Sequence, residues 1–275
     1  MTIRSPSGTP RLDLGDAIHD GWLAFSRRPW TFVAFTVLMA VALGLLWWLL
    51  DFTVTAVALA GPGRWGGRAL LLLEGIALVV LWIWTGVGLT RGASASLEGR
   101  RPRLGPMMRW EGPSIARVAQ AMLLVALILA AAVAANLLLL GGALTLVNWL
   151  AELSTGLALE ALTLVSLVLG LLILALLGCT LLAALYLAVN QKFIIQIALL
   201  EGGGPARMLR RGRRLIDPHW PLMLLLAVIE TVLLLLGLAT CFVGVFLSWP
   251  LVACISTAAY RQLVAEAASA ESPPG

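Results

Sequence analysis

Two acidic residues lie inside long apolar stretches of this 275-residue chain. Glu230 lies about ten residues, or roughly 15 Å of helix, into one stretch, and Glu74 lies about six residues into another. An ionised side chain at the centre of a bilayer costs at least about 2.5 kcal/mol, so such residues face the protein interior, find partners or stay protonated. Each carboxyl could therefore serve a proton or cation relay or contact a ligand. Alternatively, each is a protonated carboxyl bonded to a neighbouring helix, with Thr231, Asn136 or a backbone carbonyl as its partner.

The densest positive charge is a group of arginines in the segment 205–216. At helical spacing Arg207, Arg210, Arg211 and Arg214 share one face, and Met208, Gly212 and Leu215 lie opposite. A helix of this kind lies in the membrane surface. Its basic face could bind anionic lipid headgroups, at about 1 kcal/mol per basic residue, or contact a partner protein. It could also serve topology alone, or pair with the acids Asp13, Asp16 and Asp20. The same question arises more weakly for Arg100, Arg101 and Arg103.

Sequence signatures of enzymes and metal sites are missing. His19 and His219 are the only histidines, and no HExxH, GxSxG or GxxxxGK[ST] motif occurs. The three cysteines, Cys179, Cys241 and Cys254, lie in apolar segments, which argues against disulfides and metal ligation. We therefore expect a protein that is not an enzyme, with no catalytic residues, no metal and no cofactor.

Composition places most of the mass in a bilayer. Hydrophobic residues make up 60% of the chain and charged residues 12%, about half the roughly 25% of a water-soluble domain. The net charge is +5, but membrane topology accounts for most of that excess, so we expect no nucleic-acid partner. Lys192 is the only lysine beside eighteen arginines, which favours a bacterial genome rich in G and C.

The predicted fold is an all-α integral membrane protein with six spans. The spans are about 30–50, 69–90, 118–140, 161–189, 221–240 and 244–263. Seventeen of the nineteen Lys and Arg residues fall in alternate loops, in the N-terminal segment or, for Arg261, in the last residues of the sixth span, and only Arg64 and Arg68 fall elsewhere. Because cytoplasmic loops retain basic residues, both termini are predicted to be cytoplasmic, in a bacterial inner membrane.

An internal repeat divides the predicted spans into three hairpins. Leu97-Glu98-Gly99 followed by Pro102 recurs as Leu200-Glu201-Gly202 followed by Pro205. Each hairpin is predicted to follow a short cytoplasmic interfacial helix. In the first of these, within 12–26, Leu14, Ile18, Trp22 and Phe25 share a face. The resulting domains are an amphipathic N-terminal segment 1–29, a membrane domain 30–265 and a disordered cytoplasmic tail 266–275.

Proline and glycine inside the predicted spans indicate a kink and close packing. Pro250 is expected to kink the last span, because it cannot donate the helical hydrogen bond. Glycines at 86, 88 and 92, and at 170 and 178, are expected to permit close helix approach.

Several local patterns together resemble a known family. They are Asp16-Ala17-Ile18 with Gly21-Trp22 and Pro29; Arg91-Gly92-Ala93; Gln191 with Phe193-Ile194; Gly204-Pro205; and Gly244, Phe246 and Pro250-Leu251 followed by Ala259-Tyr260-Arg261. They are similar to the membrane domain found with bacterial glycerophosphoryl diester phosphodiesterases, and to related stand-alone multi-pass proteins of unknown function. In that family the hydrolytic chemistry belongs to a separate soluble domain. The resemblance therefore implies a six-helix membrane module without catalytic residues.

These observations predict a non-enzymatic inner-membrane module that organises lipid or partner proteins through its basic cytoplasmic helices. Its expected partners are the lipid bilayer, anionic lipids and a membrane protein. The alternative is a small transporter or permease that uses Glu230 and the kink at Pro250.

Overall fold

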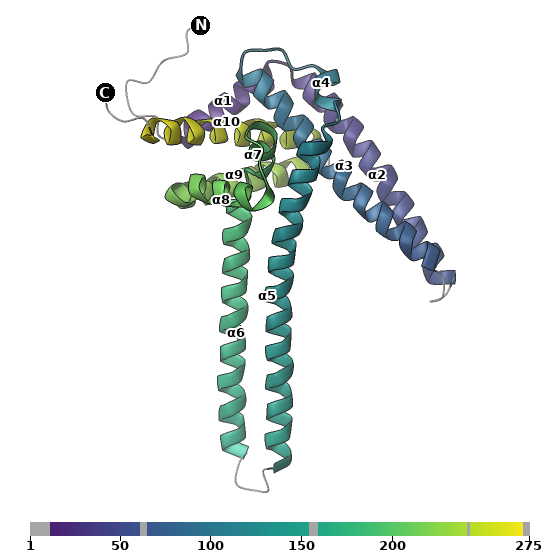
Figure 1. The fold of residues 1–275 in the computed structure, drawn as a ribbon, viewed down its shortest axis with the longest axis vertical. Helices are drawn as coiled ribbons and strands as arrows, with labels where there is room; N and C mark the ends of the chain where they lie inside the picture. Colours follow the sequence, from purple (N-terminus) through teal and green to yellow (C-terminus); the bar gives the residue numbers. More distant parts are fainter. Residues whose placement is uncertain (1–11, 61–64, 154–158, 241–242, 272–275) are drawn as a thin grey trace. The chain divides into compact units, whose positions relative to one another are not determined.

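The structure is a computed structural model that describes residues 12–60, 65–153, 159–240 and 243–271. It is 90% helix, and no strand occurs in the described part, which confirms the all-α class (Figure 1). The helices are α1 (Leu14–Ser26), α2 (Pro29–Ala60), α3 (Trp65–Leu97), α4 (Leu104–Met108), α5 (Gly112–Leu153), α6 (Leu159–Asn190), α7 (Ile194–Leu200), α8 (Pro205–Ile216), the short 3-10 turn η1 (Asp217–His219), α9 (Trp220–Ala239) and α10 (Val245–Glu271).

Five helical stretches are long and apolar enough to cross a membrane. They are Pro29–Leu59, Trp65–Leu97, Gly112–Trp149, Thr163–Leu200 and Pro205–Ala239. The first three contain the predicted spans 30–50, 69–90 and 118–140, and the last two overlap the spans 161–189 and 221–240 except for one or two residues at one end. This supports a multi-pass membrane protein. Among the described helices α10 is the one that holds the sixth predicted span, and it does not reach the same length and apolarity. The sixth span therefore stays a prediction.

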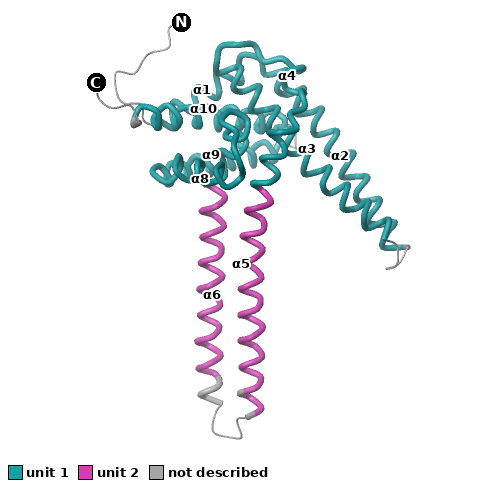
Figure 2. The backbone as a smooth tube through the Cα atoms, in the orientation of Figure 1, with its two compact units in different colours: residues 1–121, 190–275 teal, residues 122–189 magenta. Residues whose placement is uncertain are grey.

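The chain divides into two compact units (Figure 2). The first comprises residues 1–121 and 190–275, and the second comprises residues 122–189. The first unit has an apolar core at the N-terminal half of α2 and the C-terminal half of α3, joined by α1, α4 and α10. Its buried residues are Ala24, Phe25, Phe32, Phe35, Met39, Leu89, Ala93, Met107 and Cys254.

Helix α1 packs closely along α10. Asp13 caps the N-terminus of α1, because its carboxylate accepts hydrogen bonds from the backbone N–H groups of Gly15 and Asp16. A Cβ at Gly21 would lie 2.6 Å from the Ile255 Cα, so only glycine permits this approach. The contact face of α1 is formed by Ala17, Gly21, Ala24 and Phe25, all buried. The predicted apolar face of α1 is not its contact face: Phe25 is buried, but Trp22 is 54% exposed, because the closest helix approach uses small residues.

In both copies of the sequence repeat, a glycine with a positive φ angle follows the end of a helix. Gly99 and Gly202 have φ angles of +79° and +74°, which glycine adopts without steric cost. Each follows the last turn of a helix, α3 ending at Leu97 and α7 at Leu200. The Gly202 N–H donates to the Ile197 carbonyl at 2.8 Å, closing the end of α7. At the end of α3 the corresponding bond comes one residue later, from the Arg100 N–H to the Ala95 carbonyl at 2.9 Å. Both copies of the repeat therefore end a helix, but with hydrogen bonds offset by one residue.

The second unit consists of the adjoining parts of α5 and α6. The Asn136 Nδ2 group donates to the Thr180 Oγ1 atom at 2.7 Å, which joins the two helices through a polar contact. Asn136, one of the predicted partners of a buried carboxyl, therefore bonds to α6. Added Cβ atoms at Gly170 and Gly178 would meet no atom within 4 Å, so the predicted close packing at these glycines is not seen in the described chain.

Two predicted boundaries differ from the structure. Helix α10 continues to Glu271, so the predicted disordered tail 266–275 is wrong for 266–271, and residues 272–275 lie outside the described part. Helix α5 continues past its predicted span to Leu153. The extension of α10 is rich in alanine and glutamate, which favour a helix. The extension of α5 includes Gly141 and Gly142, so helix propensity does not explain it.

Candidate functional site

A break between α6 and α7 places Lys192 inside the first unit. Helix α6 ends at Asn190, a turn follows, and α7 begins at Ile194. The Ile194 N–H donates to the Gln191 carbonyl at 3.0 Å, which closes the turn. Phe193 is fully buried and its ring centroid lies 5.6 Å from that of Tyr260 on α10. The buried Phe193 anchors the turn, so the neighbouring Lys192 is directed toward α9 and α10.

Lys192, Glu230 and Ser256 form a buried polar centre. The Lys192 Nζ atom lies 2.8 Å from the Glu230 Oε2 atom, and their side chains are only 9% and 10% exposed. The Ser256 Oγ group donates to the Glu230 Oε1 atom at 2.8 Å. Both carboxylate oxygens of Glu230 are thus engaged by groups from two other segments. A buried charge needs this kind of compensation, because an isolated one carries a large desolvation penalty.

The observed partners of Glu230 differ from those that the sequence suggests. Thr231 was considered as a partner for Glu230, but its hydroxyl donates to the Ala227 carbonyl at 2.7 Å. Lys192 is not a partner predicted from the sequence, although it is the only lysine of the chain and lies three residues after an apolar run. That isolated position was the signal that could have identified it.

A second polar group lies one helical turn along α10. The Tyr260 hydroxyl donates to the Glu201 Oε1 atom at 2.6 Å, and the Arg211 Nε atom lies 3.0 Å from the Glu201 Oε2 atom. Ser256 and Tyr260 are four residues apart and share a face of α10. One face of α10 therefore presents a hydroxyl to each of two carboxylates, Glu230 and Glu201.

The arginine face of α8 is arranged largely as predicted. Met208, Gly212 and Leu215 are buried, and a Cβ at Gly212 would lie 2.8 Å from the Asn190 carbonyl oxygen. On the opposite face Arg207, Arg210 and Arg214 are exposed. Arg211 differs, because it pairs with Glu201. In the described residues, no ion pair joins this face to the acids of α1, so the predicted pairing with Asp13, Asp16 and Asp20 is not seen.

Glu74 on α3 is hydrogen-bonded to the neighbouring helix α2. The Thr53 Oγ1 group of α2 donates to the Glu74 Oε1 atom of α3 at 2.9 Å, and both residues are buried. The Thr53 hydroxyl also lies 3.0 Å from the Leu49 carbonyl. This is the arrangement expected of a carboxyl that ties two helices together.

The remaining singled-out residues lie in packed parts of the first unit. Pro250 is buried inside α10. An added Cβ at Gly86 would meet Ile195, and one at Gly88 would lie 2.7 Å from the Met107 carbonyl oxygen. One at Gly92 would lie 2.8 Å from the Met107 Cε atom. These three glycines therefore permit the close approach that was predicted for them.

Within the described ranges, no group of three or more His, Cys, Asp and Glu side chains is placed to bind a metal. No family model, no curated protein and no solved structure matches this chain. The resemblance to the phosphodiesterase-associated membrane domain therefore stays a prediction.

Proposed function

We propose that this chain is a non-enzymatic module of the bacterial inner membrane that gathers anionic lipid, or a partner membrane protein, at the arginine face of α8. The observation that carries the proposal is the burial of α8 on one side only. Met208, Gly212 and Leu215 fix the helix to the protein, and Arg207, Arg210 and Arg214 project from it. A basic face held in this way attracts anionic headgroups at about 1 kcal/mol per residue.

The proposed topology has six spans, with α10 as the sixth and both termini in the cytoplasm. The Leu12 N–H donates to the Glu266 Oε2 atom at 3.1 Å, and the Asp13 N–H donates to the Gln262 Oε1 atom at 3.2 Å. These contacts need the start of α1 and the end of α10 on one side of the bilayer. An even number of spans satisfies this requirement, whereas five spans would separate the two ends.

The modest apolarity of α10 has a physical explanation in this topology. Residues Cys254 to Tyr260 are all buried, and α10 contacts α1, α2, α3 and α9. A spanning helix that is covered by other helices does not present its polar side chains to lipid. It can therefore be less apolar than a span that faces lipid.

Lipid retention tests the proposed function. The triple variant Arg207→Gln/Arg210→Gln/Arg214→Gln should carry fewer phosphatidylglycerol molecules than the wild type in native mass spectra of the purified protein. The matched variant with lysine at the same positions should retain most of them, because it keeps the charge. Unchanged lipid retention in the glutamine variant would contradict lipid binding by this face and leave a role in topology.

A small transporter is the second candidate. The observation that favours it is the helix break at 190–193 beside the buried Lys192–Glu230 pair, since transporters place ion sites where helices are interrupted. In this function Glu230 would exchange its ionic partner during transport, and Pro250 would allow α10 to bend. Proton flux into proteoliposomes under an imposed potential should then be lost in Glu230→Gln. Absence of flux in the wild type, or equal flux in both proteins, would exclude the proposed role of Glu230.

A further inference from the structure

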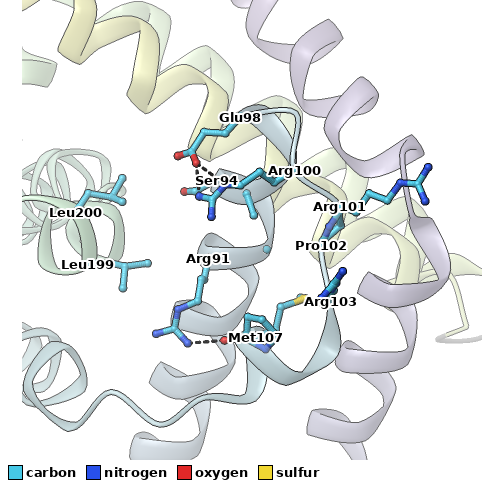
Figure 3. Close-up of a pocket in the computed structure, with 13 residues that line it drawn as sticks. Arg91, Ser94, Glu98, Arg100, Arg101, Pro102, Arg103, Met107, Leu199 and Leu200 are labelled. Atoms are coloured by element: carbon cyan, nitrogen blue, oxygen red, sulfur yellow. Dashed lines mark hydrogen bonds and ion pairs between the residues drawn. The ribbon is translucent and has the colours of Figure 1, made fainter.

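A pocket of about 720 Å³ lies at the end of α3, outside the sites described above. It is lined by residues from α3, the 100–103 loop, α4 and the last residues of α7 (Figure 3). Small-molecule sites in proteins typically occupy about 300–1,000 Å³. The pocket is therefore large enough for a headgroup and the first part of an attached chain.

The lining is strongly basic. It includes four arginines, Arg91, Arg100, Arg101 and Arg103, and one acid, Glu98. Two of the arginines are already engaged: Arg91 lies 2.8 Å from a Glu111 oxygen, and Arg100 pairs with Glu98, as Figure 3 shows for the latter pair. Arg101 and Arg103 are exposed, and no carboxylate of the described residues pairs with either. Neither guanidinium group has a carboxylate partner in the described chain, and Figure 3 shows that the Arg101 side chain is directed away from Ser94 and the two leucines of α7. Because both side chains are exposed, they are free to turn toward an anion from outside the protein.

A buried hydroxyl lines the same pocket without a partner. Ser94 is 7% exposed, and its Oγ atom has no hydrogen-bond partner in the described structure. Buried polar groups in proteins are normally satisfied by the protein, by water or by a ligand. The Ser94 hydroxyl therefore identifies a position for a polar atom of a bound molecule.

The rest of the wall is apolar. Met107, Ala95, Leu199 and Leu200 line the pocket, and Figure 3 shows the two leucines across from the α3 residues Ser94 and Glu98. A free inorganic anion would gain nothing from this surface. A molecule with a charged head and an apolar tail would satisfy both parts of the lining.

We infer that this pocket binds the phosphate group of an anionic amphiphile. Arg103 contacts the phosphate, and Arg101 turns from its orientation in Figure 3 to contact it too, since guanidinium groups match the phosphate oxygens in charge and geometry. Ser94 hydrogen-bonds to the head, and Leu199 and Leu200 contact the start of the tail. The phosphate could belong to a membrane phospholipid or to a soluble phosphate ester. This inference goes beyond the proposed function, because it needs no contribution from α8.

The test compares two variants of the pocket with one of the arginine face. The full chain is purified in mild detergent and titrated with phosphatidylglycerol, and bound lipid is counted by native mass spectrometry. The wild type and the α8 triple glutamine variant should each retain one tightly held lipid per chain. Arg101→Gln/Arg103→Gln should bind it roughly 30-fold more weakly, the sum of two phosphate contacts. Ala95→Phe should also lose it, because the ring fills the apolar side while every arginine remains.

Competition distinguishes the two sources of phosphate. Displacement of the lipid by glycerol 3-phosphate would assign the pocket to a soluble phosphate ester, and resistance would assign it to a phospholipid. Retention of the lipid by both pocket variants would overturn the inference. Loss of the lipid in the α8 variant alone would also overturn it and leave the proposed function standing. If only the pocket variants lose the tightly held lipid, and the α8 variant binds as many lipids as the wild type, the result would support the pocket. The same result would contradict lipid binding by the arginine face of α8.

Discussion

The Lys192 Nζ atom lies 2.8 Å from the Glu230 Oε2 atom, in a centre where both side chains are at least nine-tenths buried. The pair joins the turn between α6 and α7 to the middle of α9. Ser256 adds α10 to the same centre through its hydrogen bond to Glu230. Three segments are therefore joined by one polar centre that is almost completely buried.

Removing one member of this pair should destabilise the protein strongly. In Glu230→Gln, Lys192 would remain as a buried charge without its counter-ion, and loss of one partner of a buried pair costs about 3–5 kcal/mol. Chemical denaturation in detergent would measure the change in the free energy of unfolding. The double variant Lys192→Met/Glu230→Leu should recover most of the loss, because it removes both charges.

The exposed pair of Arg100 and Glu98 provides a control for that experiment. Their side chains are 69% and 40% exposed, and exposed ion pairs contribute at most about 1 kcal/mol. Arg100→Gln should therefore leave the free energy of unfolding almost unchanged. A Glu230→Gln variant as stable as Arg100→Gln would contradict a charged Lys192–Glu230 pair.

Gly21 should be intolerant of any side chain. An added Cβ would lie within 2.7 Å of the Ile255 backbone, which cannot move aside as a flexible side chain can. Gly21→Ala should cost about 1–3 kcal/mol through overpacking and release α1 from α10. Faster tryptic cleavage after Arg27 would report that release, because the bond between Arg28 and Pro29 resists trypsin.

Gly44→Ala is the matched control for this substitution. An added Cβ at Gly44, in the middle of α2, would meet no atom within 4 Å. Alanine is favoured over glycine in a helix by about 1 kcal/mol, so this variant should be as stable as the wild type or more stable. Similar cleavage rates in the Gly21 and Gly44 variants would show that α1 does not depend on the close approach.

The sequence predicted those features that depend on periodicity within one element. The buried stripe of Met208, Gly212 and Leu215 follows from helical spacing beside a run of arginines, and the structure confirms it. The contact face of α1 was missed because periodicity favours large apolar residues such as Trp22. A docked helix instead uses small residues, of which Gly21 is the closest to its partner.

Pairing across the fold could not be read in the same way. Glu230 was recognised as a buried acid that needed a partner, but its partner is set by the helix break that turns Lys192 inward. No local pattern encodes that distance. The pocket at the end of α3 likewise joins α7 to α3 and α4, segments far apart in the sequence.

The Thr53–Glu74 hydrogen bond should contribute to the pairing of α2 and α3 through the hydroxyl alone. Thr53→Val keeps the side-chain shape but leaves a buried carboxyl oxygen without its donor, which should cost about 1–3 kcal/mol. Glu74→Gln retains a carbonyl oxygen that can accept the same bond, so its stability should stay close to that of the wild type. A large loss in Glu74→Gln and none in Thr53→Val would indicate that the charge of Glu74 has a role beyond this contact.

Accessibility of single cysteines should place the two ends of the described chain on one side of the bilayer. After Cys179, Cys241 and Cys254 are replaced by alanine, cysteine is introduced at Asp20, Ser269 or Gly66, three exposed positions. In intact cells with a permeable outer membrane, an impermeant maleimide should label the Gly66 variant and reach the other two only after the inner membrane is opened. Labelling of Asp20 and Ser269 variants from opposite sides would require an odd number of spans. Because Leu12 and Glu266 could then not be hydrogen-bonded, that result would contradict the docking of α1 on α10 as well as the sixth span.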